Sequence, residues 1–160
     1  MSENTPRLAG YLDKQLPDLY QALSGYAEQV TAEADRTGIP RTTLELVNYR
    51  ASQINGCAFC LDLHHRRAIG LGETEQRLAL VPVYGEVELF NEAEKVALEL
   101  AEQITRMSTA RPTAELFSRA RLVYSEEQIS VLCMACIGIN AFNRLSILSE
   151  HRVRKARSSP

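Results

Sequence analysis

The segment RASQINGCAFCLDLHHRRAIG, residues 50–70, carries the pattern on which the fold prediction depends. Asn55-Gly56 favours a helix end, because both residues tolerate the left-handed backbone conformation that closes a helix. We therefore expect a new helix to begin at Cys57 and to run through the rest of the segment. In such a helix Cys57, Cys60 and His64 lie on one face, since they are separated by three and four residues. The segment predicts two helices joined by a tight turn, with two thiols and one imidazole aligned after it.

The sequence on both sides of this segment is also helical in its periodicity. Apolar residues recur every three or four positions, and capping-box pairs are present at Asn91 with Glu94 and at Ser125 with Gln128. The predicted helices are 12–34, 42–55, 57–70, 73–80, 91–107, a short helix opening at Pro112, and 129–148, with a loop at 83–90. We expect an all-α, single-domain fold of about six to seven helices over residues 1–160, with a frayed tail at 151–160.

Composition limits the classes of function. The 160 residues are 45% hydrophobic and 24% charged, with a formal net charge of -2, which gives no general attraction to nucleic acid or anionic membranes. Because neither a secretory signal nor an apolar run of about 18 residues is visible, we expect a cytoplasmic protein without a membrane span. Thiols stay reduced there, so the four cysteines are not expected to form structural disulfides.

The close pair Cys57 and Cys60 points to redox chemistry. A helix N-terminus favours thiolate over thiol, and this argument alone favours Cys57 as the more acidic thiol. The imidazole of His64 can accept or return a proton, and two thiols at this spacing can close a disulfide. Together these groups would make a two-electron redox centre.

Glu45, on the preceding helix, has two interpretations. It can complete a capping box with Thr42, and spacing alone favours this role. Alternatively, the turn at Asn55-Gly56 can fold it back beside the next helix, where a carboxylate would orient His64 or take a proton.

Other interpretations of the polar and thiol residues stay open. Cys57 and Cys60 could provide half of a zinc site, with His64 or His65 as a third ligand, but the only other close pair is Cys133 and Cys136. That pair lies in the apolar stripe of the helix 129–148, where cysteine commonly packs as a small hydrophobe. The remaining polar residues near the motif are expected to form a solvated face: Asp62, His65, Arg66 and Arg67.

Two stretches of the sequence resemble a known family. The residues E-L-V-N-Y-R-A-S-Q-I-N-G-C-A-F-C-L-D-L-H from Glu45, continued by G-E-T-E-Q-R-L, resemble the core of the alkylhydroperoxidase D-like proteins in the carboxymuconolactone decarboxylase family. The segment I-N-A-F-N-R-L, Ile139 to Leu145, is similar to the helix that ends this domain. The core would span about residues 41–82. One position differs, because Phe59 stands where the best-known alkylhydroperoxidase of the family has a further histidine.

The resemblance implies a fold, an activity and a role for each site residue. It implies an all-helical homo-oligomer, a trimer or hexamer, in which apolar helices form the interfaces. Cys60 would be the peroxidatic thiol and Cys57 the resolving thiol, while His64 and Glu45 would form a proton relay. Hydroperoxides would be reduced without a metal or cofactor, and a lipoylated or thioredoxin-like dithiol partner would restore the thiols. The alternative is a redox-sensing or binding module that forms the same disulfide without turnover.

Overall fold

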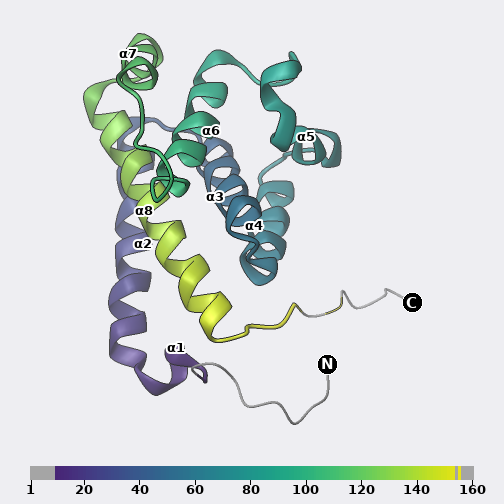
Figure 1. The fold of residues 1–160 in the computed structure, drawn as a ribbon, viewed down its shortest axis with the longest axis vertical. Coiled ribbons are helices and arrows are strands. Elements are labelled where there is room, and N and C mark those ends of the chain that lie inside the picture. Colours follow the sequence, from purple (N-terminus) through teal and green to yellow (C-terminus); the bar gives the residue numbers. More distant parts are fainter. Residues whose placement is uncertain (1–9, 154, 156–160) are drawn as a thin grey trace.

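The computed structural model describes residues 10–153 and 155, and throughout that part of the chain every regular element is helical (Figure 1). The elements are α1 (Leu12–Gln15), α2 (Pro17–Thr37), α3 (Arg41–Asn55), α4 (Ala58–Gly70), α5 (Glu75–Leu80), the 3-10 helix η1 (Val81–Glu86), α6 (Glu92–Thr105), α7 (Ala114–Val123) and α8 (Glu126–Leu148). The all-α prediction is confirmed. Of the predicted frayed tail, residues 154 and 156–160 lie outside the described residues.

The predicted count of six to seven helices is wrong, since the described residues form eight α-helices. The extra helix comes from a break in the predicted helix 12–34. Leu16 has φ -130° and ψ 65° immediately before Pro17, which separates α1 from α2. The proline ring clashes with a helical conformation of the residue before it, but Pro17 itself suits the first turn of a new helix. Both predicted capping boxes, at the starts of α6 and α8, are present.

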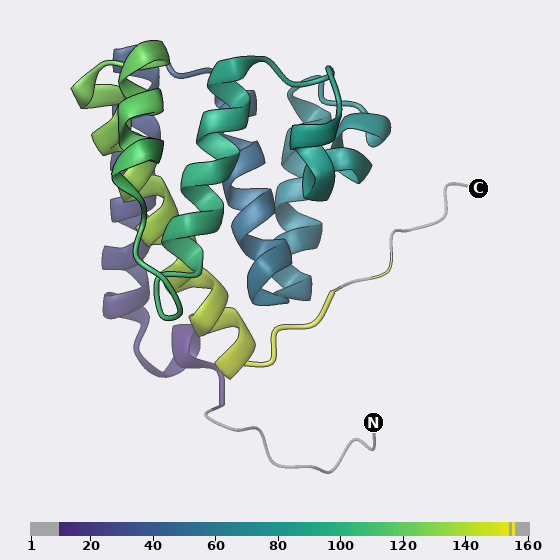
Figure 2. The same cartoon turned by 45° about the horizontal axis from the view of Figure 1, so that its top comes forward.

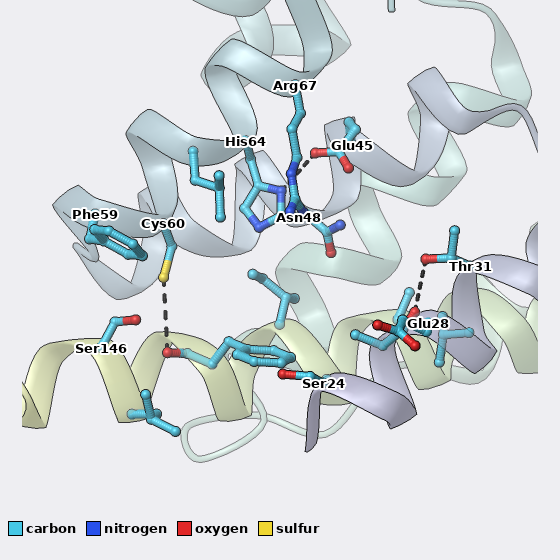
Figure 3. A pocket seen from close by; sticks show the side chains of 18 of the residues that line it. Ser24, Glu28, Thr31, Glu45, Asn48, Phe59, Cys60, His64, Arg67 and Ser146 are labelled. Carbon is cyan, nitrogen blue, oxygen red and sulfur yellow. Dashed lines mark hydrogen bonds and ion pairs between the residues drawn. The ribbon is translucent and has the colours of Figure 1, made fainter. Parts of the chain in front are cut away.

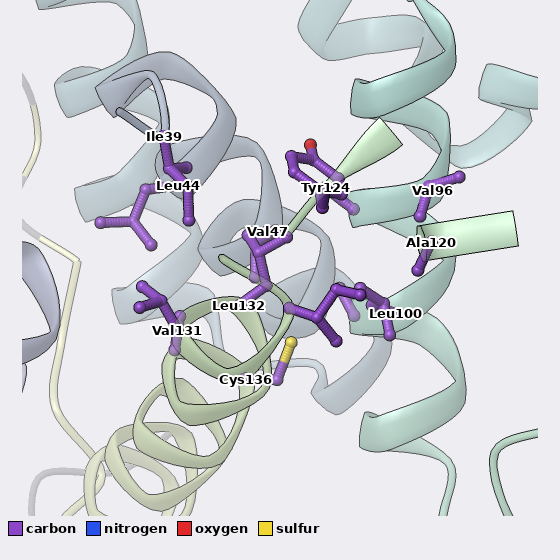
Figure 4. Packing of buried hydrophobic residues seen from close by; sticks show 14 of the residues in the cluster. Ile39, Leu44, Val47, Val96, Leu100, Ala120, Tyr124, Val131, Leu132 and Cys136 are labelled. Atoms are coloured by element: carbon purple, nitrogen blue, oxygen red, sulfur yellow. The ribbon is translucent and has the colours of Figure 1, made fainter. Parts of the chain in front are cut away.

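Helix α3 is central to the packing, because it contacts α4, α6 and α8, while α2 covers the other side of α8 (Figures 1 and 2). The main core lies between α2, α3, α6, α7 and α8 and includes fully buried Val47, Leu100 and Leu132 (Figure 4). A second cluster lies between α3, α4, α5, η1 and α6. Helix α8 is long and apolar enough to cross a membrane, but core helices meet the same criterion, and 44% of its most apolar window is buried within the protein.

The turn between α3 and α4 places the two thiols. Gly56 ends α3 with φ 65°, and the backbone N–H of Cys57 donates to the carbonyl of Ser52 at 3.1 Å. Cys57 is then the N-cap of α4, and its Sγ accepts the backbone N–H of Cys60 at 3.4 Å. The helix end predicted at Asn55-Gly56 is confirmed.

The left-handed conformation of Gly56 gives a stability prediction. A Cβ built at Gly56 has no neighbour within 4 Å, so Gly56→Ala should cost only backbone strain, about 1–2 kcal/mol of unfolding free energy. Gly25→Ala, in the middle of α2 and equally unobstructed, is the control and should leave the protein as stable or more stable. Urea unfolding measures both, and equal stability of the two variants would contradict the argument.

Candidate functional site

The structure brings together the four residues that the sequence singled out. Helix α4 packs back along α3, so Glu45 of α3 lies opposite His64, one turn after Cys60. His64 Nδ1 and Glu45 Oε2 are 2.7 Å apart, and the two side chains are only 8% and 12% exposed. An ionised carboxylate only accepts hydrogen bonds, so Nδ1 carries the proton and Nε2 is the free ring nitrogen. Figure 3 shows the ring of His64 between Glu45 and Cys60.

The capping-box interpretation of Glu45 is wrong. Helix α3 begins at Arg41 with Pro40 as its N-cap and has no side-chain cap. Thr42 therefore lies inside the first turn, two positions after the N-cap. The carboxylate of Glu45 is thereby free to pair with His64.

The two thiols form a close, buried pair. Both are free, they are 2% and 3% exposed, and their sulfur atoms lie 2.7 Å apart. The hydrogen bond that Cys57 donates lowers the pKa of Cys60 to about 6, against the opposing effect of burial. The same hydrogen bond, with burial, raises the pKa of Cys57. Cys60 is thus the more acidic thiol, contrary to the argument from the helix N-terminus.

Helix α8 contributes a third side of the site that the sequence did not predict. Side-chain hydrogen bonds from Ser146 and Asn143, and the charge of His64, further lower the pKa of Cys60. The Cys60 sulfur also lies 3.9 Å from the carbonyl oxygen of Phe142. The available signal was that polar residues, Asn143 and Ser146 among them, interrupt the end of a largely apolar helix, inside and just after the segment Ile139 to Leu145.

Buried amides hold α8 in register with the thiol turn. Asn143 is fully buried and donates to Ser52 Oγ at 3.0 Å, while Asn55 donates to Asn140 and Asn143 at 2.9 and 2.8 Å. An unpaired buried amide would cost about 1–3 kcal/mol, so this network strongly favours one alignment of α3 and α8. No described buried side-chain nitrogen or oxygen lacks a partner.

Cys60 opens onto a large cavity. The cavity has a volume of about 1380 Å³ and lies between α2, α4 and α8, and its lining includes Cys60, His64 and Glu45 but not Cys57 (Figure 3). Much of the remaining lining is apolar or aromatic: Tyr20, Ala27, Phe59, Leu63, Ile139 and Phe142. A ligand in this cavity can therefore reach the sulfur of Cys60 first.

The other polar residues near the motif lie toward the surface. His65 pairs with Glu75 at 2.9 Å and Arg66 with Asp62 at 2.8 Å. Arg67 is exposed, as expected for a solvated face, but it also lines the cavity. Within residues 10–153 and 155 no group of three histidine, cysteine or acidic residues is arranged to hold a metal ion.

The second cysteine pair belongs to the core. Cys136 is fully buried in the main cluster and Cys133 packs against it. Burial raises the pKa of both thiols. These thiols behave as small apolar side chains, in agreement with the packing interpretation.

The site can perform two-electron thiol chemistry. It holds an acidic thiol that faces a cavity, a second thiol within reach of it, and an imidazole fixed by a carboxylate. The acidic thiol can act as a nucleophile, the imidazole can supply a proton, and the second thiol can close a disulfide.

Comparisons with known proteins agree on the family and the fold. Residues 17–103 match the profile of the carboxymuconolactone decarboxylase family. The chain is 44% identical over 117 residues, 73% of its length, to the uncharacterized protein YdfG of Bacillus subtilis (strain 168), of which 80% is covered.

Two solved structures have the same helical arrangement. One is ATU0492 from Agrobacterium tumefaciens, a protein of unknown function suggested to be an antioxidant defence protein AhpD. It matches with a TM-score of 0.85 and 26% identity over 92% of this chain and 99% of that one. The other, the debrominase Bmp8, matches with a TM-score of 0.75 and 21% identity over 88% of this chain and 74% of that one, a likeness of fold.

Proposed function

This chain belongs to the carboxymuconolactone decarboxylase family, and we propose that it reduces organic hydroperoxides through the thiols of Cys60 and Cys57. The observation that carries the proposal is the position of Cys60. It is an acidic thiol at the wall of a large cavity, with a second thiol in contact behind it. The similarity of the fold to that of ATU0492 also supports the proposed peroxidase function.

The proposed reaction balances in two steps. The thiol proton of Cys60 first passes to the free Nε2 of His64. The Cys60 thiolate then attacks the outer oxygen of the hydroperoxide, the O–O bond breaks, and Nε2 returns the proton to the leaving alkoxide, which becomes an alcohol. Cys60 is then a sulfenic acid. The sulfur of Cys57 attacks it, water leaves, and the Cys57–Cys60 disulfide forms. An external dithiol, of the lipoylated or thioredoxin-like class, takes up the oxidising equivalents in the cytoplasm, and no metal or cofactor takes part.

The cavity suggests that the substrate is larger than hydrogen peroxide. We expect kcat/KM to be at least about tenfold higher for cumene hydroperoxide than for hydrogen peroxide, because burying the aromatic group against the apolar wall is favourable. Ala27 lines the cavity from α2, whereas both thiols lie at the start of α4, and Ala27→Trp would fill part of the cavity. This variant should lose the preference for cumene hydroperoxide yet react normally with hydrogen peroxide. Equal rates for both peroxides in the unmodified protein would contradict the expectation.

The acidity of Cys60 predicts the pH dependence of its reactivity. With a pKa of about 6, the thiolate is present above pH 6 and is lost as the pH falls below it. The rate at which iodoacetamide alkylates Cys60 should rise with increasing pH and reach half its maximum near pH 6. For an ordinary cysteine this midpoint lies at about pH 8.5. Cys57→Ala removes the donor and should move the midpoint upward, while Cys57→Ser keeps a hydroxyl donor and should move it less. A midpoint that is the same in all three proteins would contradict the role of this hydrogen bond.

Steady-state turnover distinguishes the enzyme from a redox sensor. With excess cumene hydroperoxide and dihydrolipoamide as the dithiol, the enzyme should consume many equivalents of peroxide per chain. A single equivalent consumed, followed by a stable disulfide, would support a sensor in place of an enzyme.

The exposed apolar side chains of α8 favour a homo-oligomer, and the family resemblance implies a trimer or hexamer. Met134, Ile137, Ile147 and Leu148 are each more than two-fifths exposed in the isolated chain. Apolar side chains at this density on one helix are typical of a subunit interface. Light scattering at micromolar concentration measures the assembly, and a monomeric mass would contradict it.

A further inference from the structure

A second histidine approaches the thiols from the end of the chain. His151 follows α8, and its side chain is only 14% exposed. Its Nε2 lies 3.1 Å from Asp13 Oδ1 on α1, and its Nδ1 lies 3.3 Å from Ser146 Oγ on α8. The ring stacks on Tyr11 at 5.8 Å between centroids and meets the edge of Phe59 at 5.1 Å. Three parts of the chain thus hold this imidazole in one orientation.

Ser146 connects this imidazole to the redox pair. The side chain of Ser146 lowers the pKa of both Cys57 and Cys60 through hydrogen bonding. Figure 3 shows the hydroxyl of Ser146 beside the sulfur of Cys60, on the side away from His64. A carboxylate, an imidazole and a hydroxyl therefore follow one another toward the thiol of Cys60.

We propose that Asp13, His151 and Ser146 form a second proton path to the thiols, separate from the pair of Glu45 and His64. The inference rests on the proposed function and adds a second path for the thiol protons of each turnover. Ser146 lies beside the sulfur of Cys60. His151 acts through Ser146, and Asp13 orients His151.

The protonation of Asp13 determines which atom donates and which accepts in each hydrogen bond of this path. Burial would raise the pKa of this carboxyl, but the hydrogen bond and charge of His151 outweigh that effect and lower it. An ionised Asp13 only accepts, so Nε2 of His151 carries a proton and Nδ1 of the neutral ring is an acceptor. Nδ1 then accepts the Ser146 hydroxyl proton, and the Ser146 oxygen accepts the thiol proton.

Two coupled transfers ionise Cys60 along this path. The thiol proton passes to the Ser146 oxygen, and the hydroxyl proton of Ser146 passes to Nδ1. The products are a thiolate and an imidazolium, with Ser146 now donating to the thiolate and Asp13 facing the new positive charge. In the second step of the reaction, Ser146 can take the proton of Cys57 and return it to the hydroxide that leaves the sulfenic acid. No atom or charge is gained or lost.

Several titratable and charged groups surround His151. Among the described residues of α1, α4, α8 and its own segment they include Asp13 and Lys14, Tyr11, the thiols of Cys57 and Cys60 beyond Ser146, and Glu150 and Arg152. Lys14 pairs with Asp13 at 3.5 Å but is 78% exposed, so solvent screens it. Asp13 is the charged group in direct contact with the ring.

The test compares three variants of His151 and Ser146. His151→Phe keeps a ring against Tyr11 and Phe59 but removes both nitrogens. His151→Asn keeps a side-chain amide whose oxygen can accept the hydrogen bond of the Ser146 hydroxyl in place of Nδ1, but it cannot take up a proton. Ser146→Ala breaks the path at the thiol.

The readout is the pH profile of Cys60 alkylation by iodoacetamide, together with the rate of disulfide formation after one equivalent of cumene hydroperoxide. His151→Phe and Ser146→Ala should each reduce alkylation at pH 6 by roughly three- to tenfold and move the midpoint upward. The double variant should lose no more than Ser146→Ala alone, because His151 acts through Ser146. His151→Asn should restore most of the alkylation profile but still form the disulfide slowly.

The possible outcomes separate the two proposals. An unchanged pH profile in His151→Phe, or a normal rate of disulfide formation in His151→Asn, would overturn the second path and, with normal peroxide reduction, leave the proposed function standing. Additive losses in the double variant would overturn it as well, since His151 would then act independently of Ser146. Shifted profiles in a protein that reduces no peroxide would support the path and contradict the proposed function.

Discussion

Replacing Cys60 with serine is expected to abolish hydroperoxide reduction, with a loss of roughly 10³-fold or more in kcat/KM. A serine hydroxyl is not ionised near neutral pH and is a far weaker nucleophile toward peroxide than a thiolate. Cys57→Ser should behave differently. It keeps the attacking thiol, so it should consume one equivalent of peroxide and stop at a Cys60 sulfenic acid, which dimedone traps.

Cys133→Ser is the matched control for these two variants. Cys133 packs against the core, away from the site, and its replacement should leave the peroxide reaction unchanged. Peroxide consumption by coupled assay measures all three proteins. If Cys60→Ser retained activity, or if Cys57→Ser failed to react even once, the assignment of the two thiols would be reversed or wrong.

Glu45→Gln is expected to lower kcat/KM by roughly 10²-fold, the usual contribution of a general acid or base. The amide cannot stabilise a protonated His64, and it no longer ensures that Nδ1 is the ring nitrogen carrying the proton. The loss should be largest in the release of the alcohol product, because that step takes the proton from His64.

The chain offers a close control in Glu75→Gln. Glu75 pairs with the neighbouring His65 at 2.9 Å, but its side chain is 76% exposed and the pair lies outside the cavity lining. This variant should keep full activity. Equal losses in the two variants, or no loss in Glu45→Gln, would show that the Glu45 carboxylate has no special part in the reaction.

Local sequence signals predicted most of the fold. The turn at Asn55-Gly56 and both capping boxes depend on residues within one or two turns, and all three are present. The break at Leu16 was missed because the apolar period continues across Pro17. The Thr42–Glu45 box was wrong for a related reason, since Pro40 starts the helix before Thr42 can cap it.

Only the part of the site that lies on a single helix could be predicted from the sequence. Cys57, Cys60 and His64 share one helix face, so their spacing alone aligned them. Ser146 and His151 come from more than 80 residues away, and no local rule brings them to the thiols. The helix-end argument favoured Cys57 because it ignored the hydrogen bond between the two thiols: the S–H of Cys57 donates to the sulfur of Cys60, and this bond makes Cys60 the more acidic thiol.

The most direct test of the account is the fate of the four thiols after one equivalent of cumene hydroperoxide. Intact mass spectrometry of the fully reduced protein, followed by alkylation and peptide mapping, gives the result. We predict a loss of two hydrogen masses, a disulfide between Cys57 and Cys60, and free Cys133 and Cys136. Four alkylatable thiols after the treatment, or a disulfide that excludes Cys60, would contradict the account.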